Sequence, residues 1–320
     1  MVNGKKLVVS ASPHLRTKDT TRGIMLDVVI SLIPALIAAV ILFGPRVLAV
    51  TATTVITAVL SEFVARKVMK RHNTIGDLSA VVTGLILAFN LPVSIPLWMA
   101  AIGSFFAIVV IKQFFGGIGQ NFANPAIAAR IILLISFGQA MGNWTAPLSW
   151  KTDAVSTATP LAIIGGESAE ALPSLLDMFL GIRGGCIGET CAIAIILGGI
   201  FLLMTRVISP AAPLTFIGTL ALLTAVSGGD ALYHVLSGGL LFGAFFMATD
   251  YVTTPVTTKG KVIFGIGCGL ITFLIRTFGA YPEGVSFAIL LMNLLTPYID
   301  RLTRTKPFGI VEVKEVKGNG

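Results

Sequence analysis

Long apolar runs constrain this chain more than any other feature of its sequence. Ten runs have roughly the length of a helix, and about 20 residues cross a bilayer as one helix. The chain is 55% hydrophobic and only 12% charged, too little polar surface to cover a soluble globule. The sequence therefore predicts an all-α polytopic membrane protein. The runs are residues 24–43, 47–65, 78–91, 97–115, 126–137, 190–205, 211–226, 231–249, 262–278 and 285–299.

The number and length of the runs predict a repeated architecture. Runs 78–91 and 126–137 are short, which indicates half-helices or helices that extend into their flanks. Ten spans divide into five plus five, and a tandem repeat of an odd number of spans is inverted, as in transport-type cores with broken helices. "GGIGQNFANPA" (116–126) and "MATDYVTTP" (247–255) interrupt the two halves. We therefore expect two inverted five-helix repeats.

The distribution of Lys and Arg predicts the orientation. With the N-terminus inside, inner segments hold all but five of the 23 basic residues, the bias that cytoplasmic loops show. Both termini are therefore expected in the cytoplasm. The net charge of +8 does not indicate nucleic-acid binding, because the sequence has no basic stripe with interleaved aromatic residues. The five exceptions are Arg46, Lys151, Arg183 and Arg276 on outer segments and Arg130 within a span.

The same reasoning divides one membrane domain, 1–320, into five parts. The N-terminus is polar through Arg22, so the first apolar run is a retained span and not a cleaved signal. The parts are a cytoplasmic tail (1–23), a first helical repeat (24–137), an extracytoplasmic loop (138–189), a second helical repeat (190–302) and a second cytoplasmic tail (303–320).

A polar segment within the long loop, "KTDAVSTATPLAIIGG" (151–166), contains a helix start. Thr is a good N-cap and Pro is favoured at the first helical position, so Thr159 and Pro160 predict a helix that begins there. The local sequence leaves two interpretations open. Either Thr159 only caps the helix, or the start of the helix also binds an anion such as a phosphate.

Three other places carry candidate polar groups. "GGIGQNFANPA" brings Asn121 and Asn124 to a helix start at Pro125, either as a plain joint or as a site for a planar ligand. Asp250 lies at the inner end of a span, where a carboxylate either caps the next turn or acts in function. Glu189 lies at the outer mouth of the sixth span, where it either compensates the helix dipole or binds a cofactor.

Other chemistries have little support in the sequence. Cys186 and Cys191 lack a zinc spacing, which leaves a structural role or an occasional disulfide, and we expect no metal site. The histidines, His14, His72 and His234, lie in unrelated places, so no catalytic triad is expected. Iron–sulfur or haem ligation also lacks its ligands. Redox chemistry on this chain would need an organic cofactor.

Five separated motifs resemble the RnfD/NqrB family, the flavinylated membrane subunits of Rnf and sodium-pumping NADH:quinone oxidoreductase complexes. "DAVSTATPL" (153–161) is similar to their flavinylation signature, although Thr157 stands where Gly is usual. The first span begins by residue 24, which resembles the Rnf branch more than the quinone-reductase branch. The other motifs are "GGIGQNFANPA", "GCIGET" (185–190), "MATDYVTTPVTTKGK" (247–261) and "GAYPEGVSFAILLMN" (279–293).

The resemblance implies a urea-transporter-like fold and a covalent FMN, linked through its phosphate to the Thr159 hydroxyl by a flavin transferase outside the cytoplasm. Asp153, Ser156 and Glu189 are the further residues expected at this site. It also implies a non-covalent riboflavin near Asn121 and Asn124 and an ion pathway through Asp250. These last two expectations rest on less than the Thr159 assignment does.

The function so implied is electron transfer between reduced ferredoxin and NAD⁺, coupled to movement of Na⁺ or H⁺. Expected partners are the A, B, C, E and G subunits of the Rnf complex, in the prokaryotic inner (cytoplasmic) membrane. No NAD or iron–sulfur site, and no catalytic residue beyond the flavin, is expected on this chain. The alternatives are a B-type component of the quinone reductase, a cofactor-free solute transporter or channel, and a purely structural scaffold.

Overall fold

Helices make up most of the protein. The structure, a computed structural model, describes residues 19–151, 157–166, 168, 170–279 and 283–305. The first group of helices ends with a π-helical continuation of α4 and a short α5. Its elements are α1 (Thr21–Phe43), α2 (Arg46–Val68), η1 (Ile75–Asp77), α3 (Ser79–Phe89), α4 (Leu97–Phe105), η2 (Phe106–Gln113) and α5 (Pro125–Ser136).

Short elements connect this group to a second one. The connection carries α6 (Gly138–Met141), η3 (Ser149–Lys151), α7 (Pro160–Ile164) and α8 (Leu175–Leu180). The second group also contains a π-helical segment, η4. Its elements are α9 (Ala192–Met204), α10 (Ala211–Val226), α11 (Ala231–Leu236), α12 (Leu240–Phe242), η4 (Gly243–Met247), α13 (Thr258–Phe278) and α14 (Val285–Thr303).

Four helices, α1, α2, α13 and α14, are long and apolar enough to cross a membrane. Shorter apolar helices accompany them: α3, α4 with η2, α5, α9 and α10. The predicted all-α polytopic class is confirmed, and most expected runs match a helix within a few residues. Run 231–249 is the exception, because it is divided into α11, α12 and η4. Gly238 interrupts it with a φ of +63°, which favours glycine and is incompatible with a continuous helix.

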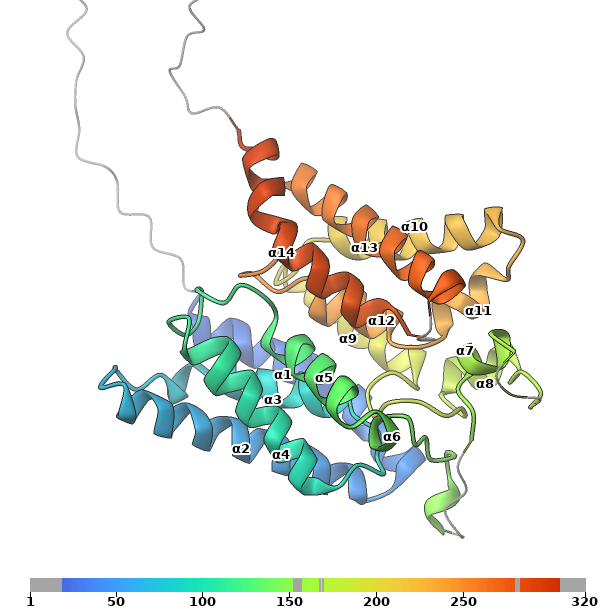
Figure 1. Ribbon diagram of the computed structural model, residues 1–320, viewed down its shortest axis with the longest axis horizontal. Coiled ribbons are helices and arrows are strands. Elements are labelled where there is room, and N and C mark those ends of the chain that lie inside the picture. The colour runs from blue at the N-terminus through green and yellow to red at the C-terminus, as the bar shows by residue number, and fades with distance from the viewer. Residues whose placement is uncertain (1–18, 152–156, 167, 169, 280–282, 306–320) are drawn as a thin grey trace, which may run out of the picture.

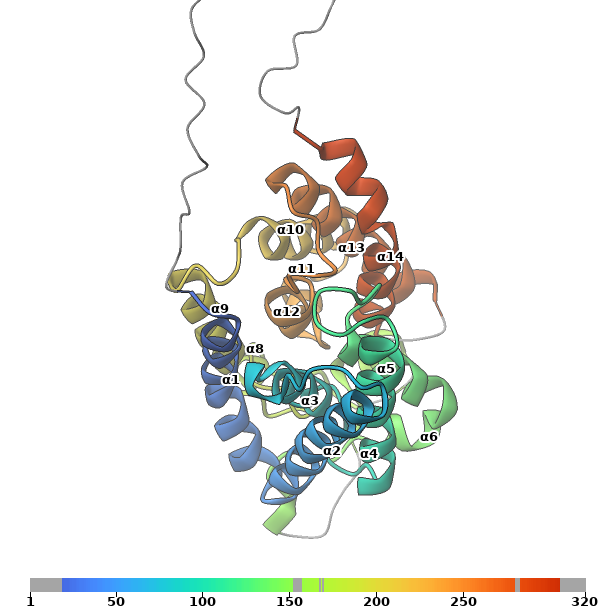
Figure 2. The same cartoon turned by 90° about the vertical axis from the view of Figure 1, so that its left-hand side faces the viewer.

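The two groups of helices lie side by side (Figures 1 and 2). α9 packs along α1, and α5 lies next to α14. Gly198 permits the first of these contacts, since a Cβ there would stand 2.2 Å from the backbone oxygen of Ser31. The N-terminal end of α1 lies at the left in Figure 1 and the C-terminal end of α14 at the top, whereas α7 and α8 lie at the right. The inverted symmetry of the two groups stays a prediction.

The break after α3 shows how an interrupted span is stabilised. α3 ends at Phe89, and its last backbone carbonyls have no partner within the helix. The segment before α9 supplies donors: Gly188 N donates to Phe89 O at 2.8 Å, and Ile187 N donates to Leu91 O at 3.0 Å. Non-helical backbone at membrane depth requires such partners from the protein. The break is therefore held by the other half of the chain.

Candidate functional site

Thr159 is the N-cap of α7, as the Thr-Pro pair predicted. Its backbone is extended, and its Oγ1 accepts a hydrogen bond from Ala162 N at 3.3 Å. Among the described residues the hydroxyl donates to no acceptor. α7 has only five residues, so few aligned peptide dipoles are available to attract an anion. The useful feature of Thr159 is therefore its oriented hydroxyl rather than a strong helix dipole.

Glu170 forms hydrogen bonds with the residues that precede Thr159. Its Oε2 accepts from Thr157 Oγ1 at 3.0 Å and from Ala158 N at 3.3 Å. On the other side, Thr157 N donates to Trp144 O at 3.1 Å. The two hydroxyls of this segment thus differ: that of Thr157 is engaged by a carboxylate, and that of Thr159 is not.

The segment 157–161 packs directly on two glycines, Gly184 and Gly238. A Cβ on Gly184 would lie 2.6 Å from Thr157 Cγ2, and a Cβ on Gly238 would lie 2.8 Å from Leu161 Cδ1. Larger residues at either place would push the segment away. Gly238 also adjoins Glu283, whose Cγ would be 3.6 Å from that Cβ. The segment therefore lies over a group of buried charges.

These buried groups, the charge cluster, are Arg130, Glu283, Asn90, Ser286, Cys186 and Glu189. Arg130 of α5 forms an ion pair with Glu283, which precedes α14. It also donates to Asn90 Oδ1 at 3.0 Å and to Ser286 Oγ at 2.8 Å. Glu283 Oε1 in turn accepts from Gly239 N at 3.0 Å. A buried charge is costly unless paired, and here the guanidinium joins three separate elements.

Three members of the charge cluster have the donor types of a metal site. Cys186, Glu189 and Glu283 place a sulfur and two carboxylate oxygens within 4.8 Å of one another. Arg130 already lies among them, with Nη2 3.6 Å from Cys186 Sγ. A divalent cation would stand beside this guanidinium, which electrostatic repulsion disfavours. The arrangement fits an ion-pair network better than a metal centre.

Glu189 belongs to this network and not to the first turn of α9. The helix starts at Ala192 with no acidic residue in its first turn, so the dipole-compensation interpretation is wrong. The backbone instead turns at Glu189, whose carbonyl accepts from Arg183 Nη2 at 2.7 Å. Burial, together with the neighbouring Glu283 carboxylate, raises the pKa of Glu189, in the loop before α9, to about 7.

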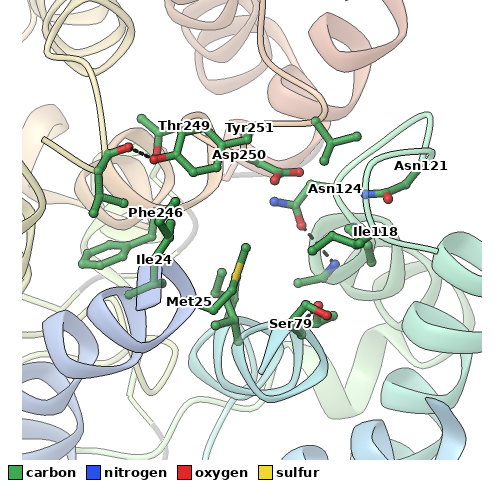
Figure 3. A pocket seen from close by; sticks show the side chains of 18 of the residues that line it. Ile24, Met25, Ser79, Ile118, Asn121, Asn124, Phe246, Thr249, Asp250 and Tyr251 are labelled. Carbon is green, nitrogen blue, oxygen red and sulfur yellow. Dashed lines mark hydrogen bonds between the residues drawn. The ribbon is translucent and has the colours of Figure 1, made fainter. Parts of the chain in front are cut away.

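A cavity of about 340 Å³ lies between the two groups of helices, lined by residues of both groups and by none of α7. We call it the asparagine cavity. Figure 3 shows Asn121, Asn124 and Asp250 on one side of it and the apolar Met25 and Phe246 on the other. The three polar residues named from the sequence thus share one site, although they come from the loop before α5 and the turn after η4.

The polar groups of the asparagine cavity have few partners. Asn124 is the N-cap of α5: its Oδ1 accepts from Ala126 N at 3.0 Å, and its Nδ2 donates to Met247 O at 3.5 Å. Asn121 Oδ1 is buried without a hydrogen-bond partner in the described part of the chain. Asp250 accepts from Thr253 Oγ1 at 3.0 Å, a bond within the turn that follows η4.

A buried lysine also lines the asparagine cavity. Lys112 Nζ lies 2.9 Å from Glu62 Oε2 and 2.6 Å from Ser79 Oγ, and both ion-pair partners are almost completely buried. Lys112 is therefore not an inner loop charge, because it lies within η2 and points into the protein. An interior lysine needs a counter-charge, and Glu62 of α2 supplies it.

Asn90 connects the charge cluster to the asparagine cavity. Its Oδ1 accepts from Arg130, and its Nδ2 donates to Met247 Sδ at 3.2 Å. Met247 O is also the acceptor for Asn124. The two polar regions are thus joined through Asn90 and Met247, at the level where α3 and η4 end.

Of the other residues named from the sequence, Asp153 and Ser156 lie outside the described residues. The structure adds Arg130, Glu283 and Asn90, which sequence reasoning did not select. Arg130 had a visible signal, because it is the basic residue that falls within a span. Cys186 and Cys191 are both free thiols and not a disulfide.

These features define a class: an all-α, polytopic membrane protein whose short helices end on buried charged and polar groups. The chain belongs to the NQR2, RnfD, RnfE family, whose model matches residues 8–309. The family predicted from the five motifs is therefore confirmed.

Individual relatives cover nearly the whole chain. It is 48% identical to the D subunit of the Na(+)-translocating ferredoxin:NAD(+) oxidoreductase complex of Acetobacterium woodii, over 98% of this chain and 99% of that protein. It is 44% identical to the D subunit of the proton-translocating ferredoxin:NAD(+) oxidoreductase complex of Clostridium ljungdahlii, over 94% and 96%. The D subunit of the ion-translocating oxidoreductase complex of Stutzerimonas stutzeri is 39% identical, over 91% and 93%.

Proposed function

We propose that the chain is the D-type membrane subunit of an ion-translocating ferredoxin:NAD⁺ oxidoreductase complex and works with the other Rnf subunits. Its similarity to such subunits over nearly their full length supports this role. The relatives from Acetobacterium and Clostridium are named for different ions, so the proposal covers Na⁺ and H⁺ alike. A B-type component of the quinone reductase is less well supported, because these relatives are named for ferredoxin:NAD⁺ complexes.

Within this role, the Thr159 hydroxyl carries FMN through a phosphoester bond. The observation that supports it best is the coincidence of the signature "DAVSTATPL" with an N-cap hydroxyl that the backbone orients and that donates to no described acceptor. A flavin supplies one- and two-electron redox chemistry when bound, and a covalent tether fixes its place relative to neighbouring centres. The excess of Lys and Arg on the other side supports an extracytoplasmic location for this loop.

Flavin fluorescence in a denaturing gel tests this assignment. Membranes from cells that also produce the flavin transferase should give a fluorescent band for the wild-type chain and for Thr157→Val. Thr159→Val should abolish the fluorescence, because valine has no oxygen to bond the phosphate. A wild-type band without fluorescence would favour the cofactor-free transporter or channel instead. Full complex activity of Thr159→Val would support the structural-scaffold alternative.

The asparagine cavity is the proposed site of a second, non-covalent flavin. Its volume of about 340 Å³ is at the lower end of ligand pockets, and the apolar side with Met25 and Phe246 suits a flat ring. The unpartnered Asn121 Oδ1 offers an acceptor for a ring or ribityl donor. Riboflavin released by acid from the Thr159→Val variant, which cannot hold the covalent flavin, measures occupancy of this cavity alone.

Asp250 is the proposed carboxylate of an ion route on this chain. It borders the asparagine cavity and a second cavity lined by Arg206 and Lys261, so it lies between two spaces open to small solutes. Asp250→Asn removes the charge while keeping the shape. We expect it to slow ion transport by the complex in vesicles more than it slows ferredoxin-dependent NAD⁺ reduction by uncoupled membranes. Equal loss of both rates would exclude a specific role in the ion route.

A further inference from the structure

Segment 157–159 contains two threonine hydroxyls only two residues apart, and the flavin transferase must choose between them. In the related signature Gly is usual at the first place, so this chain has an acceptor that its relatives' pattern lacks. The two hydroxyls lie in different surroundings, although both residues are half-buried. The difference arises from one side chain, Glu170.

Glu170 engages the first hydroxyl and leaves the second alone. A single carboxylate oxygen accepts from Thr157 Oγ1 at 3.0 Å and from the adjacent Ala158 N at 3.3 Å. Thr157 is held further by its backbone bond to Trp144 O and by the contact of its methyl group with Gly184. Thr159 Oγ1 accepts from Ala162 N instead, which orients its lone pairs without occupying its proton.

From this geometry we infer that Glu170 is the residue that directs the flavin to Thr159 rather than to Thr157. The inference rests on the proposed covalent FMN. A phosphate group approaching Thr157 would meet a carboxylate within hydrogen-bond distance of the attacking oxygen, and like charges at that distance repel. The proton of the Thr157 hydroxyl is also engaged by Glu170. Thr159 has neither obstacle.

This repulsion opposes the reaction that attaches the flavin phosphate to a threonine. The threonine oxygen bonds to the flavin-side phosphorus of a flavin adenine dinucleotide, and the bond from that phosphorus to the bridging oxygen breaks. AMP leaves with the bridging oxygen, and the hydroxyl proton passes to a base of the transferase. No electrons are gained or lost. Because the reacting phosphorus carries anionic oxygens throughout, a carboxylate beside the acceptor opposes the approach.

The test compares acceptor sites by tandem mass spectrometry of peptides from the assembled complex, produced together with the transferase. Glu170→Gln keeps the size of the side chain and a hydrogen-bond acceptor but removes the charge. In a Thr159→Val background, we expect Glu170→Gln to raise the flavin found on Thr157 about fivefold, the effect of removing a like-charge contact at an exposed place. Thr159→Val alone should leave Thr157 almost unmodified.

A matched control uses another acid of the same loop. Asp177, which is half-buried in the first turn of α8, accepts from the hydroxyl of Ser174 at 2.7 Å. It makes no hydrogen bond with Thr157 in the described residues, so Thr159→Val/Asp177→Asn should stay unmodified. The single variant Glu170→Gln provides a second measurement, in which Thr157 should gain flavin relative to Thr159. It also keeps the inference testable if the double variant does not assemble.

Two results would overturn the inference. One is an assembled Thr159→Val/Glu170→Gln chain with no more flavin on Thr157 than Thr159→Val. The other is abundant flavin on Thr157 in Thr159→Val alone. If the wild-type chain carries FMN on Thr159, either result contradicts only the role of Glu170. A wild-type chain without flavin on any residue contradicts the proposed function and, with it, this inference.

Discussion

The charge cluster and the asparagine cavity meet at Asn90 and Met247, yet they treat their polar groups in opposite ways. In the charge cluster the guanidinium of Arg130 is bound by Glu283, Asn90 and Ser286. In the cavity, Asn121 Oδ1 has no partner among the described residues, and Asp250 is bonded within its own turn. Satisfied polar groups hold elements together, whereas unsatisfied ones are available to a ligand or ion. The comparison indicates a structural cluster beside a binding cavity.

The largest expected effect comes from breaking the ion pair of the charge cluster. Arg130→Met leaves Glu283, whose side chain is 18% exposed, without its cation. Loss of one partner of a buried pair costs about 3–5 kcal/mol, and the partial exposure of Glu283 places this variant at the lower end. We expect a much lower yield of assembled protein and a lower Tm in detergent. Glu283→Gln should act in the same direction, because it leaves the guanidinium unpaired.

A double variant tests whether an unpaired charge is what destabilises the single variants. Arg130→Met/Glu283→Met removes both charges, so no buried charge stays unpaired, and it should be more stable than either single variant. Single variants with a wild-type Tm would show that water reaches these groups and that the charge cluster does not hold the helices together.

An intermediate effect is expected from Asn124, which caps α5 and lines the asparagine cavity. Asn124→Ala removes the N-cap of α5 and should cost about 1 kcal/mol, a small decrease in Tm. It should also reduce riboflavin retained in the cavity. Asn124→Asp is the informative control: the carboxylate still caps the helix but has no N–H to donate to Met247 O. Stability restored without riboflavin would assign the amide a binding role.

The smallest effect on stability is expected from Asn121. Asn121→Ala removes a side chain whose buried oxygen has no partner in the part of the chain that the structure describes, so the free energy of unfolding should change by less than about 0.5 kcal/mol. Riboflavin released by acid should nevertheless fall severalfold. Gln120→Ala, at the exposed neighbouring position, should alter neither quantity. A large loss of Tm with Asn121→Ala would instead make the cavity a structural feature like the charge cluster.

The parts of this protein that sequence predicted correctly are local. The cap at Thr159 and the helix start at Pro125 follow from local preferences, since a capping side chain bonds backbone groups two or three residues ahead. The dipole-compensation interpretation of Glu189 failed because it depends on where α9 begins, and helix ends are the least certain part of such reasoning. The gathering of Asn121 and Asp250 in one cavity was not predicted, because it depends on how the two groups of helices pack.

What the sequence by itself determined is the set of membrane-length helices and their caps, because the thickness of hydrocarbon and local hydrogen bonding leave few alternatives. Arg130 also had to find a partner, since a charge within a span is costly alone. Only the tertiary structure decided that the partner is Glu283, 153 positions away. That choice depends on α5 and α14 meeting side by side, and no local pattern specifies which helices meet.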